Sequence, residues 1–291
     1  MGQACCCAER TDAEVKARAA RERPDALPPL GDKHRGEKHS KPGDDCERFD
    51  LAFETDDYAE FVSLLKSDQK ITKLEERMHP WAQDPTTVGA LAATQLAILA
   101  SSTEKAGVKD TIREAGAIPP LVAFLSSRED DRVQAAVVAL SFLTVENSAN
   151  CMAIYKAGGF APLVPHLRSP IEGMRAATAS TLRNVYSQSC ECRNAFVRMG
   201  GVQPLVELLD CHSVGADGES NWDTQFETLP NLEDLVVVDG EAVPELLEAV
   251  KRAGAEARVR ALCDCEDKEV AELAQAMIKR VEASERTPVP Q

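Results

Sequence analysis

The feature that most constrains this chain is a repeat of fixed length. Glycines at positions 116, 158 and 200 are each 42 residues apart, and a Pro-Leu-Val motif begins four residues after each of them. A further glycine, Gly254, follows after 54 residues, so one repeat carries an insertion of 12. A constant period of this length predicts stacked structural repeats, none of which buries its apolar face alone.

Each repeat reads as two short helices followed by a long one. The glycine suits the left-handed position that ends a short helix, and the proline fits the first turn of the next helix. Long amphipathic helices are predicted over 86–101, 129–145, 171–187, 221–238 and 266–282. Three helices in about 42 residues is the armadillo pattern. An irregular helical bundle is the alternative, but it would not explain the equal spacing.

Composition agrees with a helical protein, because only 4% of the residues are aromatic while 44% are apolar. We therefore predict an all-α fold, an armadillo-repeat right-handed solenoid of about five repeats over 49–291, with a disordered N-terminal tail. Helices are expected over 49–67 and 71–81 in the first repeat. Pro230 is expected to kink or split the helix around it.

The first seven residues carry a lipidation pattern. Loss of the initiator methionine would expose Gly2, the acceptor for N-myristoylation, although Cys6 stands where the usual motif has Ser or Thr. One myristoyl chain binds a membrane only reversibly, and a second acyl chain on a nearby thiol makes the anchor stable. We predict residues 1–7 as an acylation motif, with S-palmitoylation among Cys5, Cys6 and Cys7. The alternative is a redox or metal cluster, which three consecutive cysteines do not easily form.

Residues 8–48 are predicted to be a disordered linker, since they are rich in Pro and Gly and lack apolar periodicity. Residues 1–48 contain ten Lys or Arg and ten Asp or Glu, so the net charge of −15 belongs to the rest of the chain. The tail has no polybasic patch, and the anchor should therefore depend on thioesters. The acidic balance also argues against nucleic acid as a partner.

The third helices of an armadillo solenoid line its concave face and commonly carry an Asn that hydrogen-bonds an extended peptide. Here that position holds Ile98, Phe142, Asn184, Asn231 and Lys279. The Trp residues that importins place one turn earlier are missing, which argues against an importin-like cargo role. We predict a partner-binding groove formed by Ile98, Phe142, Asn184, Asn231, Arg183 and Arg175. The arginines could equally be solvated, and the insertion 211–221 is a second candidate surface.

No constellation for catalysis is found, and neither a cofactor nor a metal site is expected. The five histidines have no Ser or Cys partner at a suggestive spacing, and no phosphate-binding Gly loop is present. Cys190 and Cys192, like Cys263 and Cys265, resemble half-sites for zinc, but without nearby His they are better read as partly buried structural thiols. We therefore expect that the chain is not an enzyme.

The chain resembles the apicomplexan armadillo repeats-only proteins over essentially its whole length. The resemblance rests on Gly2 with Cys5–Cys7, the linker, the block His79-Pro80-Trp81, and the segment Thr94–Ser101. It implies a protein tethered by myristate and palmitate to the cytosolic face of rhoptries. The implied acylation sites are Gly2, Cys5 and Cys6, and Cys7 is a further candidate.

The resemblance also implies a role in gathering and positioning these organelles at the cell apex. It implies an unconventional myosin, a dedicated interacting adaptor and an adenylate cyclase as partners. The alternative function is a soluble armadillo co-chaperone that acts as nucleotide exchange factor for a heat-shock ATPase. Such a protein would have no use for Gly2 or the cysteine run.

Overall fold

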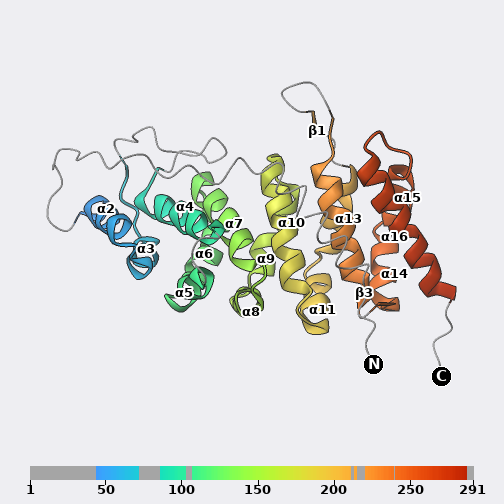
Figure 1. Cartoon of the computed structure of the whole chain (residues 1–291), viewed down its shortest axis with the longest axis horizontal. Coiled ribbons are helices and arrows are strands. Elements are labelled where there is room, and N and C mark those ends of the chain that lie inside the picture. Colours follow the sequence, from blue (N-terminus) through green and yellow to red (C-terminus); the bar gives the residue numbers. More distant parts are fainter. Residues whose placement is uncertain are drawn as a thin grey trace. The chain divides into compact units, whose positions relative to one another are not determined.

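The computed structural model describes residues 44–71, 86–102, 107–210, 213–214, 220–238 and 240–286 (Figure 1). The described residues form two compact units, 44–163 and 164–286. The predicted motif at 1–7 and residues 8–43 of the predicted linker lie outside the described residues, as do residues 72–81 of the predicted helix at 71–81. The end of the predicted linker at residue 48 is wrong, because residues 45–48 already belong to helix α2 (Asp45–Thr55).

The first unit is a stack of helices. They are α2 (Asp45–Thr55), α3 (Tyr58–Leu64), α4 (Val88–Ser101), α5 (Val108–Glu114), α6 (Ile118–Phe124), α7 (Asp130–Thr144), α8 (Ser148–Lys156) and α9 (Phe160–Leu163). The long helices predicted at 86–101 and 129–145 are confirmed as α4 and α7, which pack against each other. Both bury several alanines, whose small side chains let neighbouring helices approach closely.

The glycines that mark the repeat have the predicted conformation. Gly116, Gly158, Gly200 and Gly254 have φ angles of 87°, 75°, 74° and 81°, all in the left-handed region. The N–H of Gly116 donates to the carbonyl of Arg113 at 2.8 Å, which closes the end of α5 before α6 begins at Ile118. The period in the sequence is therefore the period of the helix ends.

The start of the first unit differs from the prediction, because the single helix expected over 49–67 is two helices, α2 and α3. Asp56 adopts a left-handed φ of 54° and ends α2. The side chain of Asp57 then accepts the N–H of Glu60 at 3.0 Å and starts α3. The apolar pattern continues across this break, so periodicity alone did not reveal it.

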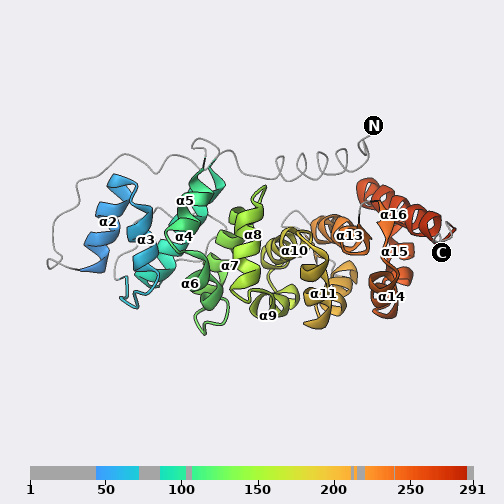
Figure 2. The same cartoon turned by 90° about the horizontal axis from the view of Figure 1, so that it is seen from below.

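The second unit repeats the same arrangement. Its elements are η1 (Val164–Arg168, a 3-10 helix), α10 (Glu172–Tyr186), α11 (Cys190–Arg198), α12 (Val202–Glu207), η2 (Leu208–Asp210, a 3-10 helix), β1 (Ser213–Val214), β2 (Ser220–Asn221), α13 (Asp223–Val236), β3 (Val237–Val238), β4 (Glu241–Ala242), α14 (Pro244–Arg252), α15 (Ala255–Leu262) and α16 (Lys268–Arg286). The predicted long helices are α10, α13 and α16, which lie side by side (Figures 1 and 2).

Two details of this unit correct the expectations. Pro230 does not split its helix, since α13 runs through it from Asp223 to Val236. A proline at this position removes one N–H donor, and the packing of α13 against α10 and α16 holds the helix together. The insertion expected as a loop at 211–221 also contains a short antiparallel ladder, in which β1 pairs with β2.

Candidate interaction surface

The predicted groove residues are divided between the two units. Ile98 lies on α4 and Phe142 on α7, and both side chains are half-buried in the first unit. Asn184 is half-buried on α10 of the second unit. The structure therefore offers partly exposed side chains on third helices in both units, an aliphatic and an aromatic one in the first and an amide in the second.

Arg183 is held by an ion pair between neighbouring third helices. Its Nε atom on α10 lies 2.6 Å from Oδ2 of Asp234 on α13, and the two side chains are 18% and 41% exposed. Burial alone would lower the pKa of Arg183, but the Asp234 carboxylate outweighs burial and raises it. Asp234 thus compensates the charge of Arg183. At the surface the Asp234 carboxylate is more exposed than the Arg183 guanidinium.

Asn231 is buried, although the repeat alignment placed it in the groove. Its backbone carbonyl accepts a hydrogen bond from the hydroxyl of Tyr186, and its side-chain amide has no hydrogen-bond partner in the described part of the chain. Burial raises the pKa of Tyr186 well above its ordinary value. In the described structure, the backbone of Asn231 is hydrogen-bonded to α10. Its side-chain amide is buried and is not exposed for a partner.

Arg175 serves the turn that precedes α10. The side chain is 9% exposed, and Nη1 donates to the carbonyls of Ser169 and Pro170 at 2.9 and 3.2 Å. These bonds satisfy two loop carbonyls and fix how the chain enters the helix. Arg132, in the first unit, is similarly engaged with Asp68 at 2.5 Å.

Sequence reasoning missed Asp234 and Tyr186, which organise the contact between α10 and α13. Arg193 of α11 also donates to the backbone carbonyl of Asp234 at 3.2 Å. Asp234 stands one helical turn after Asn231, a spacing that puts two side chains on neighbouring positions of one helix face. The spacing of Asn231 and Asp234 could therefore have indicated from the sequence that Asp234 lies near the predicted groove residue. The hydrogen bond from Tyr186 to a backbone carbonyl could not have been predicted, because a carbonyl acceptor does not depend on residue type.

The two Cys-X-Cys pairs differ in exposure. Cys192 is buried and Cys190 is exposed, while Cys263 and Cys265 are half-buried. Burial raises the pKa of both Cys263 and Cys265, which disfavours their thiolates. Among the residues that the structure describes, no three His, Cys, Asp or Glu side chains gather as they would around a metal ion. None of the described helices is long and apolar enough to cross a lipid bilayer.

Comparison with known proteins identifies the repeat. Residues 105–144 match the family model of the Armadillo/beta-catenin-like repeat. The chain is 42% identical to the solved structure of ARO (armadillo repeats only protein) from Plasmodium falciparum, with a TM-score of 0.78, over 84% of this chain and 100% of that one. A designed armadillo repeat protein in complex with the peptide (KR)4 has a TM-score of 0.60 at 22% identity, over 82% of this chain and 87% of that one, and shows the fold alone.

Curated relatives match shorter stretches. Importin subunit alpha-1b of Oryza sativa subsp. japonica is 28% identical over 146 residues, which is 50% of this chain and 27% of the importin. Rap1 GTPase-GDP dissociation stimulator 1-A of Xenopus laevis is 31% identical over 107 residues, 34% of this chain and 18% of that protein. The chain thus spans about a quarter or less of these two proteins. Armadillo repeats are generally non-enzymatic scaffolds that bind proteins or peptides.

Proposed function

Because this chain belongs to the armadillo repeats-only protein family, we propose that it is a lipid-anchored scaffold on the cytosolic face of rhoptries. In this proposal it recruits an unconventional myosin, an interacting adaptor and an adenylate cyclase, and so clusters the organelles at the cell apex. It performs no catalysis. The observation that carries the proposal is the 42% identity over the whole length of the Plasmodium falciparum structure.

The anchor is the part of the proposal that the N-terminal residues support. Gly2 would receive myristate and Cys5, Cys6 or Cys7 palmitate, and the armadillo repeats would extend from that membrane attachment toward protein partners. A soluble co-chaperone would have no need for Gly2 or the cysteine run, which favours the anchored scaffold over that alternative.

The test of the anchor is imaging of a Gly2→Ala variant in the native cell. The variant is expected to lose its localisation to the organelle and to become diffuse. The physical reason is that S-palmitoylation follows the reversible membrane binding that the myristoyl chain provides. Gly36→Ala makes the same substitution in the predicted linker and should keep the pattern. If Gly2→Ala were distributed like the unaltered protein, the tether would be refuted and the co-chaperone reading favoured.

The binding surface is tested by a double variant, Phe142→Ala with Asn184→Ala. These partly exposed side chains represent the third helices of both units, and their removal should weaken the capture of partners in pull-down experiments while circular dichroism stays unchanged. Undiminished capture by the folded double variant would contradict a surface on the third helices. It would direct attention to the insertion at 211–221.

A further inference from the structure

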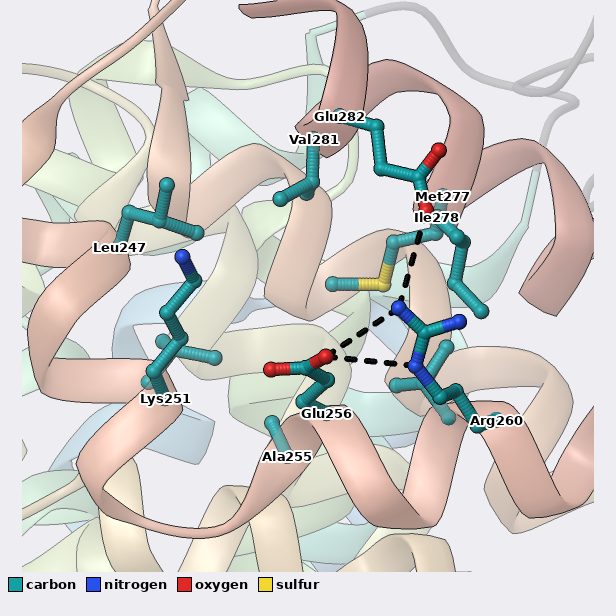
Figure 3. A pocket seen from close by; sticks show the side chains of 11 residues that line it. Leu247, Lys251, Ala255, Glu256, Arg260, Met277, Ile278, Val281 and Glu282 are labelled. Atoms are coloured by element: carbon teal, nitrogen blue, oxygen red, sulfur yellow. Dashed lines mark hydrogen bonds and ion pairs between the residues drawn. The ribbon is translucent and has the colours of Figure 1, made fainter. Parts of the chain in front are cut away.

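An apolar pocket lies among α14, α15 and α16 of the second unit. Leu247 and Val250 of α14, Val259 of α15 and Met277 of α16 are almost fully buried around a cavity of about 110 Å³. Figure 3 shows Leu247, Met277 and Val281 around a common space. A cavity of about 150 Å³ takes a benzene ring, so this one has room for a single aliphatic side chain.

Basic side chains from two helices stand at the mouth of the pocket. Lys251 of α14 and Arg260 of α15 both line it (Figure 3). Arg260 lies 3.2 Å from Glu256 and 3.6 Å from Glu282, and these two glutamates are the acidic residues of the lining. The segment 250–262, which supplies more than half of the lining, carries four Lys or Arg and one Glu, a net charge of +3. The pocket is therefore suited to an apolar side chain that has carboxylates beside it.

The first unit exposes an apolar side chain of this kind. Leu51 on α2 is 62% exposed, the most of the three large apolar side chains that the described residues leave exposed. Phe49 of the same helix is buried, whereas Asp50 and Glu54 beside Leu51 are exposed. The helix carries four Asp or Glu and one Arg, a net charge of −3. Leu51 is thus an outward apolar side chain on an acidic helix.

We propose that Leu51 of one copy of this chain inserts into the pocket of a second copy. The carboxylates of α2 then lie against Lys251 and Arg260, so that the apolar contact and the charges favour the same arrangement. Leu51 and the pocket are different surfaces of one chain, and every copy offers both. Copies therefore join head to tail, in an open chain or a ring, rather than as a symmetric pair that uses one surface twice.

The other two exposed apolar side chains fit the pocket less well. Met199 is 50% exposed and follows α11, while Ile171 is 43% exposed and precedes α10. Each of these helices carries two Arg and one Glu, so its net charge is positive like that of the segment 250–262. Charge complementarity therefore selects Leu51 as the side chain that enters the pocket.

The contact is weak by design of its size. One apolar side chain with a few charges around it buries far less area than a stable dimer needs, and its dissociation constant should be on the order of 0.1–1 mM. Copies that are crowded together associate in this range, whereas dilute copies stay apart. The inference does not depend on the lipid anchor, because both surfaces belong to the folded units.

The first test uses the full chain labelled with ¹³C at the methionine methyl groups, so that the NMR signal of Met277 reports on the pocket. Dilution from about 1 mM to about 10 µM should shift this signal, because the pocket loses its occupant. Leu51→Asp should abolish the dependence on concentration. Met199→Asp makes the same change at another exposed apolar residue and should retain it. The Met277 signal is assigned with Met277→Leu.

The second test mixes variants that each keep one surface. Labelled Leu51→Asp keeps its pocket and has no side chain to insert, while unlabelled Val281→Phe keeps Leu51 and fills its own pocket with a ring. Adding Val281→Phe, or the unaltered chain, should shift the Met277 signal of labelled Leu51→Asp, and adding unlabelled Leu51→Asp should not. Lys251→Glu in the labelled chain should weaken the effect, and Glu54→Lys in the added chain should restore it.

Two results would overturn the inference. One is a Met277 signal that stays the same at every concentration of the unaltered chain. The other is a shift of labelled Leu51→Asp that unlabelled Leu51→Asp produces as well as the unaltered chain does, which would assign the pocket to a different side chain. Circular dichroism of Leu51→Asp is expected to match the unaltered chain, since Leu51 is exposed.

Discussion

At the scale of single residues, the contact between α10 and α13 depends on polar groups, of which Tyr186 and Asn231 are buried and Asp234 is partly exposed. The hydroxyl of Tyr186 reaches the carbonyl of Asn231, while Arg183 pairs with Asp234 at 2.6 Å. Buried polar groups are costly when unpaired, so such bonds fix the relation of two helices more sharply than apolar contacts do. The Tyr186–Asn231 hydrogen bond and the Arg183–Asp234 ion pair thus fix the position of α10 relative to α13.

Tyr186→Phe tests this contact. The ring stays and the hydrogen bond is lost, so the free energy of unfolding is expected to fall by about 0.5–1.5 kcal/mol near pH 7. Burial raises the pKa of Tyr186 in the folded state, and its hydroxyl therefore stabilises the fold below the ordinary tyrosine pKa of about 10. Above that pH the unfolded chain ionises more readily and the stabilisation declines.

Urea unfolding of both proteins at neutral pH and above pH 10 measures this effect. The advantage of the unaltered chain over Tyr186→Phe should shrink as the pH rises. An advantage that grew with pH would show that the hydroxyl ionises readily in the folded state.

At the scale of helices, the start of α4 depends on a close approach to the end of α3. A Cβ added at Gly89 would lie 2.6 Å from the carbonyl oxygen of Ser67 and 2.8 Å from that of Leu65. Backbone oxygens cannot swing aside as a side chain can, so the helix itself would have to move. The closeness of α3 to α4 therefore requires a glycine at this position.

Gly89→Ala is accordingly expected to lower the free energy of unfolding by about 1–3 kcal/mol. Gly173→Ala is the control, because a Cβ there meets nothing within 4 Å. Gly173 lies in the first turn of α10, where helix propensity counts less than in the interior, so the free energy of unfolding should stay nearly unchanged. Thermal unfolding followed by circular dichroism compares the two. A tolerated Gly89→Ala would mean that α3 and α4 separate at little cost.

Most of the helical layout was predictable from the sequence, because the repeat fixes where helices end. The predicted helix at 129–145 became α7 at Asp130–Thr144, a difference of one residue at each end. The break at Asp57 was missed although Asp57 and Glu60 have the spacing of a capping box. Pro230 was judged by local preference, which the packing of α13 overrode.

The candidate surface was less predictable than the fold. A repeat alignment says which residue occupies a helix position, and it found Phe142 and Asn184 with part of their side chains exposed. It cannot say how far a position is covered, and so it did not foresee that Asn231 is buried. The pocket around Met277 escaped it too, because its walls come from three helices with no shared motif.

At the scale of the whole molecule, charge is distributed unevenly along the chain. Residues 1–48 are balanced, and the net charge of −15 lies in the remaining 243 residues. Anionic membrane surfaces repel such a body rather than attract it. If the chain is held at a membrane as proposed, the holding force is the insertion of acyl chains.

Membrane extraction separates the two forces. A high-salt wash is expected to leave the protein on its membrane, because hydrophobic insertion is not screened by ions. Hydroxylamine at neutral pH cleaves thioesters and should release most of it. Release of the protein by the high-salt wash alone would contradict the thioester anchor. An integral membrane protein measured in parallel controls for loss of the bilayer itself.

The β1–β2 ladder has a practical consequence. Val214 pairs with Ser220, so the chain leaves and re-enters the second unit at neighbouring points, roughly 5 Å apart. A fluorescent protein whose own termini lie close together can therefore be inserted between Val214 and Ser220 without separating the helices of the second unit. Such an internal label leaves Gly2 untouched, so the fate of the protein in a living cell becomes visible without blocking its acylation.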